Sequence, residues 1–230
     1  MAIQGGSASA PLVPRDRQGR VAPLDEVARA ARRCTACPLY QHATQTVFGE
    51  GPPGAPLMLI GEQPGDREDR EGHPFVGPAG GLLDRALAEA GIAREEVYVT
   101  NAVKHFSFVV KGPRRIHQKP KGREVKACQG WLAAEIEAVA PRLLVCLGAT
   151  AAQALLGPAF RLTKSRGKVV PPAGDVPLPV LATYHPSALL RAPDEETRHA
   201  LYRDLVADLK AALREVRGPA RRRTRAAARP

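Results

Sequence analysis

The sequence predicts an α/β fold, a single domain whose mostly parallel central sheet is flanked by helices on both faces. Short apolar runs at residues 57–60, 97–100 and 143–147 are typical of buried strands. Segments with helical spacing of apolar residues lie between these runs, and strand–helix alternation favours parallel pairing. The chain has 230 residues, of which 44% are hydrophobic, so one domain can bury a substantial core.

Each expected element has a local signal. Gly61 ends the first strand, Pro78 opens the helix after it, and Gly91 closes that helix. Asn101 follows the second strand, and Gly148 follows the third. The expected elements in chain order are helix 24–33, strand 57–60, helix 78–90, strand 97–100, helix 124–138, strand 143–147, helix 149–156, strands 168–170 and 179–183, and helix 194–216.

Positive charge is concentrated in two segments of the chain. The formal net charge is +11, and residues 104–123 hold seven Lys or Arg and no acidic residue. This segment is expected to be a long basic loop that binds a polyanion such as nucleic acid, with a solvated surface loop as the alternative. Residues 217–230 hold six Arg and no acidic residue, which adds only non-specific affinity.

The two ends of the chain differ in composition from the middle. Residues 1–23 are rich in Gly, Ser, Ala and Pro, and we expect them and residues 217–230 to be disordered. The folded domain is then expected to span residues 24–216. No apolar run approaches the roughly 18 residues that span a bilayer, and no signal peptide is evident. The sequence therefore predicts a cytoplasmic protein with no membrane partner.

Two carboxylates follow the first strand at a sharp turn. Gly61, Pro64 and Gly65 stop the strand and turn the backbone, and this turn carries Glu62 and Asp66. In open α/β sheets, ligands bind just beyond the carboxyl ends of the strands. Both carboxylates are therefore expected at a place where such folds do chemistry, and a solvated turn is the alternative.

Four cysteines, Cys34, Cys37, Cys128 and Cys146, are available to a metal or a cluster. The first two are spaced as C-x-x-C, which suits either a zinc ion or an iron–sulfur cluster. Disulfides are disfavoured without a secretory signal, and no strand leads into the pair as in thioredoxin-like motifs. Simple burial of Cys128 and Cys146 is the alternative, because a free cysteine packs as a small hydrophobe.

Several motifs occur in a fixed order along the chain. They are Gly-Glu-Gln-Pro-Gly at 61–65, Gly-His-Pro-Phe-Val-Gly-Pro at 72–78, a strand ending at Asn101, and His-Pro-Ser at 185–187. Together they resemble the iron–sulfur uracil-DNA glycosylases over residues 24–210. The chain looks most like the UdgX branch, which bonds covalently to uracil-containing DNA. Gln63, where ordinary members usually carry Ala, and Arg-Arg-Ile-His at 114–117 carry this closer resemblance.

The resemblance implies a cofactor and a partner. A 4Fe–4S cluster would be held by Cys34, Cys37, Cys128 and Cys146, where the residues alone leave zinc and burial open. The partner would be uracil-containing DNA, with single strands preferred, and Arg114 and Arg115 would contact its phosphates. We expect the protein to be a monomer.

Excision of uracil requires donors near the base and an anion or nucleophile near the sugar, because the base leaves with negative charge and C1′ becomes positive. Phe75 is expected to stack on the flipped uracil, and the Asn101 amide to read its N3–H and O4. The resemblance makes His185 the donor to uracil O2. Gly61 belongs to the binding surface, and Ser187 is a phosphate or turn contact.

The resemblance makes His117 the expected nucleophile, because a neutral imidazole nitrogen can capture the sugar cation before water does. Glu62 is expected to fix the tautomer of that ring and to offset its charge after alkylation. Asp66 would stabilise positive charge or orient a nucleophile. Gln63 would position the loop that carries His117 or exclude water.

Three other functions compete with a covalently trapped glycosylase. The first is an ordinary iron–sulfur uracil-DNA glycosylase that uses water and turns over. The second is a cluster-bearing protein that only binds nucleic acid, which Glu62, Asn101 and His185 at three strand ends argue against. The third is a zinc protein, which would be colourless when pure, whereas a cluster is brown.

Overall fold

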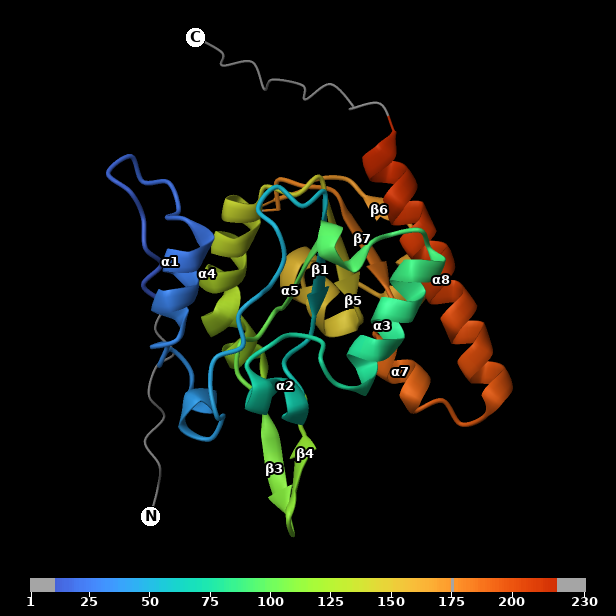
Figure 1. The fold of residues 1–230 in the computed structure, drawn as a ribbon, viewed down its shortest axis with the longest axis horizontal. Helices are drawn as coiled ribbons and strands as arrows, with labels where there is room; N and C mark the ends of the chain where they lie inside the picture. Colours follow the sequence, from blue (N-terminus) through green and yellow to red (C-terminus); the bar gives the residue numbers. More distant parts are fainter. Residues whose placement is uncertain (1–10, 175, 219–230) are drawn as a thin grey trace.

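The computed structural model describes residues 11–174 and 176–218, and within these ranges its centre is a five-stranded sheet (Figure 1). The strand order is β2-β1-β5-β7-β6. Neighbouring strands are parallel except β6, which runs antiparallel to β7. The strands are β1 (Leu57–Gly61), β2 (Val97–Asn101), β5 (Leu143–Leu147), β6 (Val169–Val170) and β7 (Val180–Thr183). The expected mostly parallel sheet is confirmed.

The register of the parallel strands brings their carboxyl ends to one edge of the sheet. Gly61, the last residue of β1, pairs with Asn101, the last residue of β2. Leu147 of β5 pairs with Thr183 of β7 in the same way. Segments that are more than a hundred residues apart in the chain therefore meet beyond this edge.

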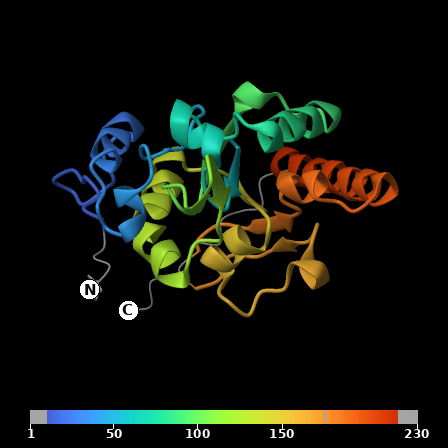
Figure 2. The ribbon, with the colours of Figure 1, turned by 90° about the horizontal axis from the view of Figure 1, so that it is seen from below.

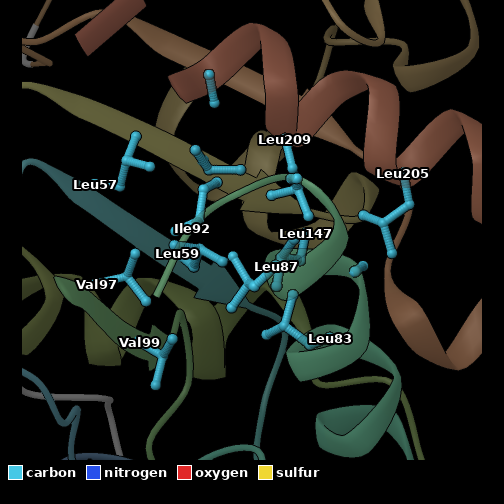
Figure 3. Packing of buried hydrophobic residues seen from close by; sticks show 14 of the residues in the cluster. Leu57, Leu59, Leu83, Leu87, Ile92, Val97, Val99, Leu147, Leu205 and Leu209 are labelled. Carbon is cyan, nitrogen blue, oxygen red and sulfur yellow. The ribbon is translucent and has the colours of Figure 1, made fainter. Parts of the chain in front are cut away.

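Alternate residues of the strands face two separate layers of helices. Leu57, Leu59, Val97 and Val99 point to one face, where helices α3 (Pro78–Glu89) and α8 (Glu195–Arg217) cover them (Figure 3). Leucines of both helices pack directly on these strand residues. Because side chains alternate between the two faces along each strand, a sheet buried on both faces needs the consecutive apolar residues that these strands contain.

The opposite face of the sheet is covered by α4 (Gly122–Val139) and α5 (Ala149–Leu156). Met58, Ile60 and Tyr98 face this layer together with Leu132 of α4. Helix α1 (Leu24–Ala31) lies outside α4 as a further layer, which is clear in the view from below (Figure 2). Helices on both faces, as expected, are confirmed.

Several short helices were not expected from the sequence. They are η1 (Pro38–Gln41), α2 (Asp66–Glu71), η2 (Arg94–Glu96), α6 (Leu162–Ser165) and α7 (Pro186–Leu190). Each is too short for apolar residues to recur at helical spacing, and caps mark the start of only two of them. Gly65 caps α2 with the help of Glu68, and the His185 side chain caps α7.

The basic segment is not a loop but contains a β-hairpin, which projects from the body (Figure 1). Strand β3 (Phe108–Lys111) pairs with β4 (Arg114–His117) in antiparallel register. The two-residue connection is Gly112-Pro113, and Gly112 has φ +59°. A glycine at positive φ followed by proline suits a type II′ turn, which matches the twist of hairpin strands. The Gly112-Pro113 turn signal was not used in the prediction because the segment was interpreted from its positive charge alone.

Residues 11–23 also differ from expectation, because they follow a defined path beside α4. Arg15 forms a β-bridge with Val21, and the Val21 N–H donates to Glu137 at 2.8 Å. Ala22 is buried in the cluster between α1 and α4. The expected disorder of residues 1–10 and 219–230 lies outside the described residues. No helix in the described part is long and apolar enough to cross a membrane.

A buried ion pair joins the end of β2 to α4. The Lys104 ammonium pairs with the Glu135 carboxylate, and both side chains are fully buried. Lys104 Nζ also donates to the Asn101 carbonyl at 2.7 Å, and Glu135 accepts from the Thr100 hydroxyl at 2.9 Å. Lys104 is therefore a structural cation and does not contribute to a DNA-binding surface.

We expect Lys104→Met to lower the free energy of unfolding by about 3–5 kcal/mol, because it leaves the Glu135 carboxylate buried without its cation. Urea denaturation followed by circular dichroism measures the change. The matched control is Arg29→Met, which breaks the exposed pair with Asp25 and should change stability by less than about 1 kcal/mol. Equal midpoints for the two variants would contradict the structural role of Lys104.

Candidate active site

A cavity of about 410 Å³ opens at the carboxyl edge of the sheet, within the size range of small-molecule sites. It is built from the turn after β1, the end of β2, the end of the hairpin and the segments that follow β5 and β7. Seven of the residues expected at the site line it: Glu62, Gln63, Phe75, Asn101, His117, His185 and Ser187.

Phe75 and Asn101 both lie directly over Gly61 in the wall of this cavity. A Cβ atom on Gly61 would lie 2.3 Å from Asn101 Oδ1 and 2.7 Å from Phe75 Cζ, so only glycine fits. Phe75 has φ +59°, a conformation that is rare for a bulky residue and occurs where function constrains the backbone. Gly80 permits it, because a Cβ there would lie 1.7 Å from the Phe75 carbonyl oxygen. The positions of the Phe75 ring and the Asn101 amide thus depend on the absence of a side chain at Gly61 and Gly80.

The hydrogen bonds of His185 define its tautomer. Its Nδ1 accepts from the backbone N–H of Ser187 at 3.1 Å and lies 2.7 Å from the Ser187 hydroxyl. Because the backbone N–H can only donate, the proton of the neutral ring must be on Nε2. Burial lowers the pKa of His185 to about 4, with contributions from Arg191 and His117. At neutral pH the ring therefore offers a single N–H donor, at Nε2.

His117, the last residue of β4, lies opposite Glu62. Its Nε2 is 3.4 Å from Glu62 Oε1, longer than an ordinary N–H···O hydrogen bond, so the carboxylate acts on the ring mainly through its charge. Burial lowers the pKa of His117, although Glu62 opposes this shift, and Arg191 lowers it further. The ring is thus neutral at pH 7 and keeps one nitrogen lone pair that can act as a nucleophile.

Gln63 holds both ends of the hairpin. Its Nε2 donates to the carbonyl oxygens of Ser107 at 3.1 Å and Gln118 at 3.0 Å, and its Oε1 accepts from the Ser107 N–H at 3.1 Å. Ser107 precedes β3 and Gln118 follows β4, immediately after His117. Alanine at position 63 could make none of these bonds. This geometry suits the positioning role expected for Gln63.

Arg115 and Asp66, both expected at the site, do not line the cavity and instead pair with each other beside it. Arg115 donates from Nη1 to Asp69 at 2.6 Å and also pairs with Asp66, so its guanidinium faces α2. Its guanidinium also lies 5.0 Å from the centre of the Phe108 ring. Arg114 is exposed, because neighbours in a strand face opposite ways. Asp66 and Arg115 therefore anchor the hairpin to the body.

Three charged residues of the cavity wall, Glu68, Lys119 and Arg191, were not expected at the site from the sequence. Glu68 accepts from the backbone N–H groups of Gly65 at 3.1 Å and Gly77 at 2.8 Å, and so ties two loops together. Lys119 and Arg191 add two cations to the wall. The spacing of Glu68 three residues after Gly65 is typical of a helix cap and could have predicted its position. The position of Arg191 could not be predicted without α7, because Arg191 caps the end of that short helix.

Three cysteines and one histidine gather between α1, α4 and the end of β2. The Cys34 thiol accepts from Trp131 Nε1 at 3.1 Å. The Cys128 thiol lowers the pKa of Cys37, and His105 adds to this effect. His105 is buried, and its Nδ1 has no hydrogen-bond partner among the described residues. An unpaired buried nitrogen beside thiols fits a ligand position for a metal or cluster.

Cys146 does not join this group. It lies in the middle of the sheet between Ile60 and Ala182, and burial alone raises its pKa to about 12. The ligand role expected for Cys146 is therefore not supported, and its apolar strand neighbours account for it. No three His, Cys, Asp or Glu side chains of the described residues converge as for a single metal ion. Cluster ligands differ, because each binds a different iron and they lie further apart.

The sheet and the cavity define an α/β protein with a site at the carboxyl edge of its strands, lined by an aromatic ring, an amide and two imidazoles. The chain belongs to the Uracil DNA glycosylase superfamily. The family model matches residues 48–210. The chain is 39% identical over 183 residues to the type-4 uracil-DNA glycosylase of Thermotoga maritima, covering 79% of this chain and 91% of the relative.

Two further relatives extend this comparison. The type-4 uracil-DNA glycosylase of Archaeoglobus fulgidus is 36% identical over 175 residues, which are 74% of this chain and 84% of the relative. The type-5 uracil-DNA glycosylase of Pyrobaculum aerophilum is 31% identical over 179 residues, which are 68% and 74%. These similarities support the family expected from the sequence and do not select one branch of it.

We expect His185 to remain neutral down to about pH 4, because burial lowers its pKa to about 4. Nitrogen chemical shifts of the ring, followed by NMR through a pH titration, measure both the midpoint and the tautomer. Ser187→Ala keeps the backbone N–H that donates to Nδ1 and should keep the Nε2–H tautomer. A midpoint near 6.5, or a proton on Nδ1 in the neutral ring, would contradict the geometry described above.

Proposed function

We propose that the protein removes uracil from DNA and then bonds covalently to the resulting sugar through His117. One observation carries this proposal: an aromatic ring, an amide, a neutral imidazole donor and a second neutral imidazole line the same cavity. Superfamily membership and the activity named for the relatives support the first step. The geometry of His117 and its hairpin supports the second.

Recognition of uracil would depend on Phe75 and Asn101. A flipped base would stack on the Phe75 ring, while the amide accepts from N3–H and donates to O4. Cytosine presents the reverse pattern at these two positions, so the same amide orientation would reject it. The close approach of both side chains to Gly61 limits their movement, which is the condition for such discrimination.

Cleavage breaks the bond between N1 of uracil and C1′, and the electron pair leaves with the base. His185 would stabilise the charge that develops on O2 by donating from Nε2. Removal of one such donor in other enzymes costs about 3–4 kcal/mol of transition-state stabilisation. A neutral donor is well suited to this role, because its proton stays on the ring throughout. The Glu62 carboxylate would stabilise the positive sugar.

Trapping follows if His117 reaches C1′ before water does. A lone pair of the imidazole forms a new N–C1′ bond, and the ring is cationic until its remaining N–H proton passes to solvent. Glu62, at 3.4 Å from the ring, would offset this charge. The three hydrogen bonds from Gln63 limit the movement of the hairpin that carries His117.

The second candidate is hydrolysis with turnover, in which water attacks C1′ and the protein is released. The partial exposure of the His117 side chain favours this reading, because solvent reaches the same region. Glu62 would then orient water in place of stabilising an alkylated ring. The two candidates share every step up to cleavage and differ only in the nucleophile.

We expect His117→Ala to abolish a covalent conjugate with uracil-containing single strands, because no other imidazole lies beside Glu62 in the cavity wall described here. Denaturing electrophoresis measures the conjugate, and chromatography of the released base measures excision. Slow release of uracil should persist, since Phe75, Asn101 and His185 are intact.

The control for this experiment is His73→Ala, which removes an exposed histidine paired with Glu50 outside the cavity. It should form conjugate like the wild type. Conjugate in His117→Ala would assign the nucleophile elsewhere, whereas free uracil without conjugate in the wild type would select hydrolysis.

The proposal includes a 4Fe–4S cluster held by Cys34, Cys37 and Cys128, with His105 as the fourth ligand. The unpaired Nδ1 of His105 and the grouped thiols support this donor set. The cluster would supply structural cross-links between the segment after α1 and helix α4. It would also fix the residues after Asn101, since His105 follows that strand end by four positions.

We expect Cys146→Ala to retain iron and visible absorbance, and Cys128→Ala to lose both, because Cys146 is buried apart from the other thiols. Iron and sulfide analysis of the purified proteins measures the loss. Colourless wild-type protein containing zinc would replace the cluster with a zinc site. Loss of iron in Cys146→Ala, with the fold retained by circular dichroism, would restore Cys146 as a ligand.

A further inference from the structure

The β3–β4 hairpin has two faces with different surroundings. Alternation along the strands and the register of the pair place Phe108, Val110, Arg115 and His117 on one face. Arg115 of this inner face pairs with Asp69 of α2, and His117 lines the cavity. Arg115 and His117 thus commit the inner face to the body of the protein and to the proposed chemistry, whereas Val110, near the tip of this face, is 71% exposed.

The outer face of the hairpin consists of Val109, Lys111, Arg114 and Ile116. Val109 is directly opposite Ile116, and these apolar residues are 48% and 40% exposed. Lys111 lies opposite Arg114, and neither forms an ion pair with any residue in the described ranges. The outer face thus combines an exposed apolar pair with two unpaired cations.

We infer that this outer face binds the unpaired nucleotides next to the uracil on the same DNA strand. This inference rests on the proposed function and extends it to a surface outside the cavity. The apolar pair would contact the faces of unstacked bases, and the cations would contact the flanking phosphates. The position of the hairpin supports this inference. The same hairpin carries His117 into the cavity, so a DNA strand whose uracil lies in the cavity would pass beside the hairpin.

Charge and chemistry select this occupant over a second copy of the chain. Two identical outer faces would bring four cations together with no acidic residue of the hairpin to offset them. Phosphates provide that offset. On DNA, the apolar surface available to an exposed aliphatic pair is the base faces, which are accessible in single strands but stacked within a duplex. The outer face therefore favours single strands.

The experiment measures binding of a uracil-free single strand and of the matching duplex by fluorescence anisotropy, over a series of salt concentrations. The variant Val109→Thr with Ile116→Thr keeps two β-branched residues in the strands and removes apolar surface without changing charge. We expect about fivefold weaker binding to the single strand, a much smaller change for the duplex, and the same dependence on salt.

A second variant tests the cations separately. Lys111→Gln with Arg114→Gln should lower the log–log slope of affinity against salt by about 1.4, because each phosphate contact on a single strand contributes about 0.7. The matched control for the double threonine variant is Leu12→Thr. It also replaces an exposed apolar residue with threonine, but at a position outside the hairpin. It should bind both forms of DNA like the wild type.

Several outcomes would overturn the inference. Wild-type affinity in the double threonine variant would show that the apolar pair contacts no bases. An equal loss on both forms of DNA would remove the preference for single strands, and a change of size in gel filtration would assign the face to self-association. Because the oligonucleotide lacks uracil, this result is independent of excision. A protein that binds as expected but neither releases uracil nor forms a conjugate would reject the proposed function alone.

Discussion

Parallel pairing of β1 with a strand on each side is the constraint on which the site depends. The register aligns Gly61 with Asn101, and through β5 it aligns the ends of β1 and β7 at the same edge. Glycine at position 61 then allows the Phe75 ring and the Asn101 amide to approach the backbone more closely than any side chain would permit. The buried strands hold this arrangement, and the cavity needs no movement of the sheet to form.

The hairpin is exposed, yet specific hydrogen bonds and ion pairs attach it to the body. Gln63 bonds to the backbone on both sides of it, and Arg115 attaches its middle to Asp66 and Asp69. All three anchors come from the turn after β1 or from α2, which follows it directly. The position of His117 is therefore set by the same end of β1 that supplies Glu62.

Much of the sheet and of the cavity could be predicted from the sequence, because strand periodicity and strand-end residues are local signals. Asn101 and His185 follow apolar runs, and this alone indicates the carboxyl edge. The roles of Arg115 and Cys146 could not be predicted, since both depend on which way a strand residue faces. One position of register separates the anchored Arg115 from the exposed Arg114. Residue type and charge are identical at the two positions, so only the fold distinguishes them.

The two histidines of the cavity, His117 and His185, share the same influences on their pKa values. Burial lowers the pKa of both, Arg191 lowers both further, and His117 also lowers the pKa of His185. A proton on either ring is thus disfavoured, which is the condition that the proposed donor role of His185 and nucleophile role of His117 require. Alkylation of His117 would place a positive charge near His185 and lower its pKa again, so the donor remains neutral after trapping. An alkylated His117 would leave no free imidazole beside Glu62, so the proposed trapping would allow one reaction per protein.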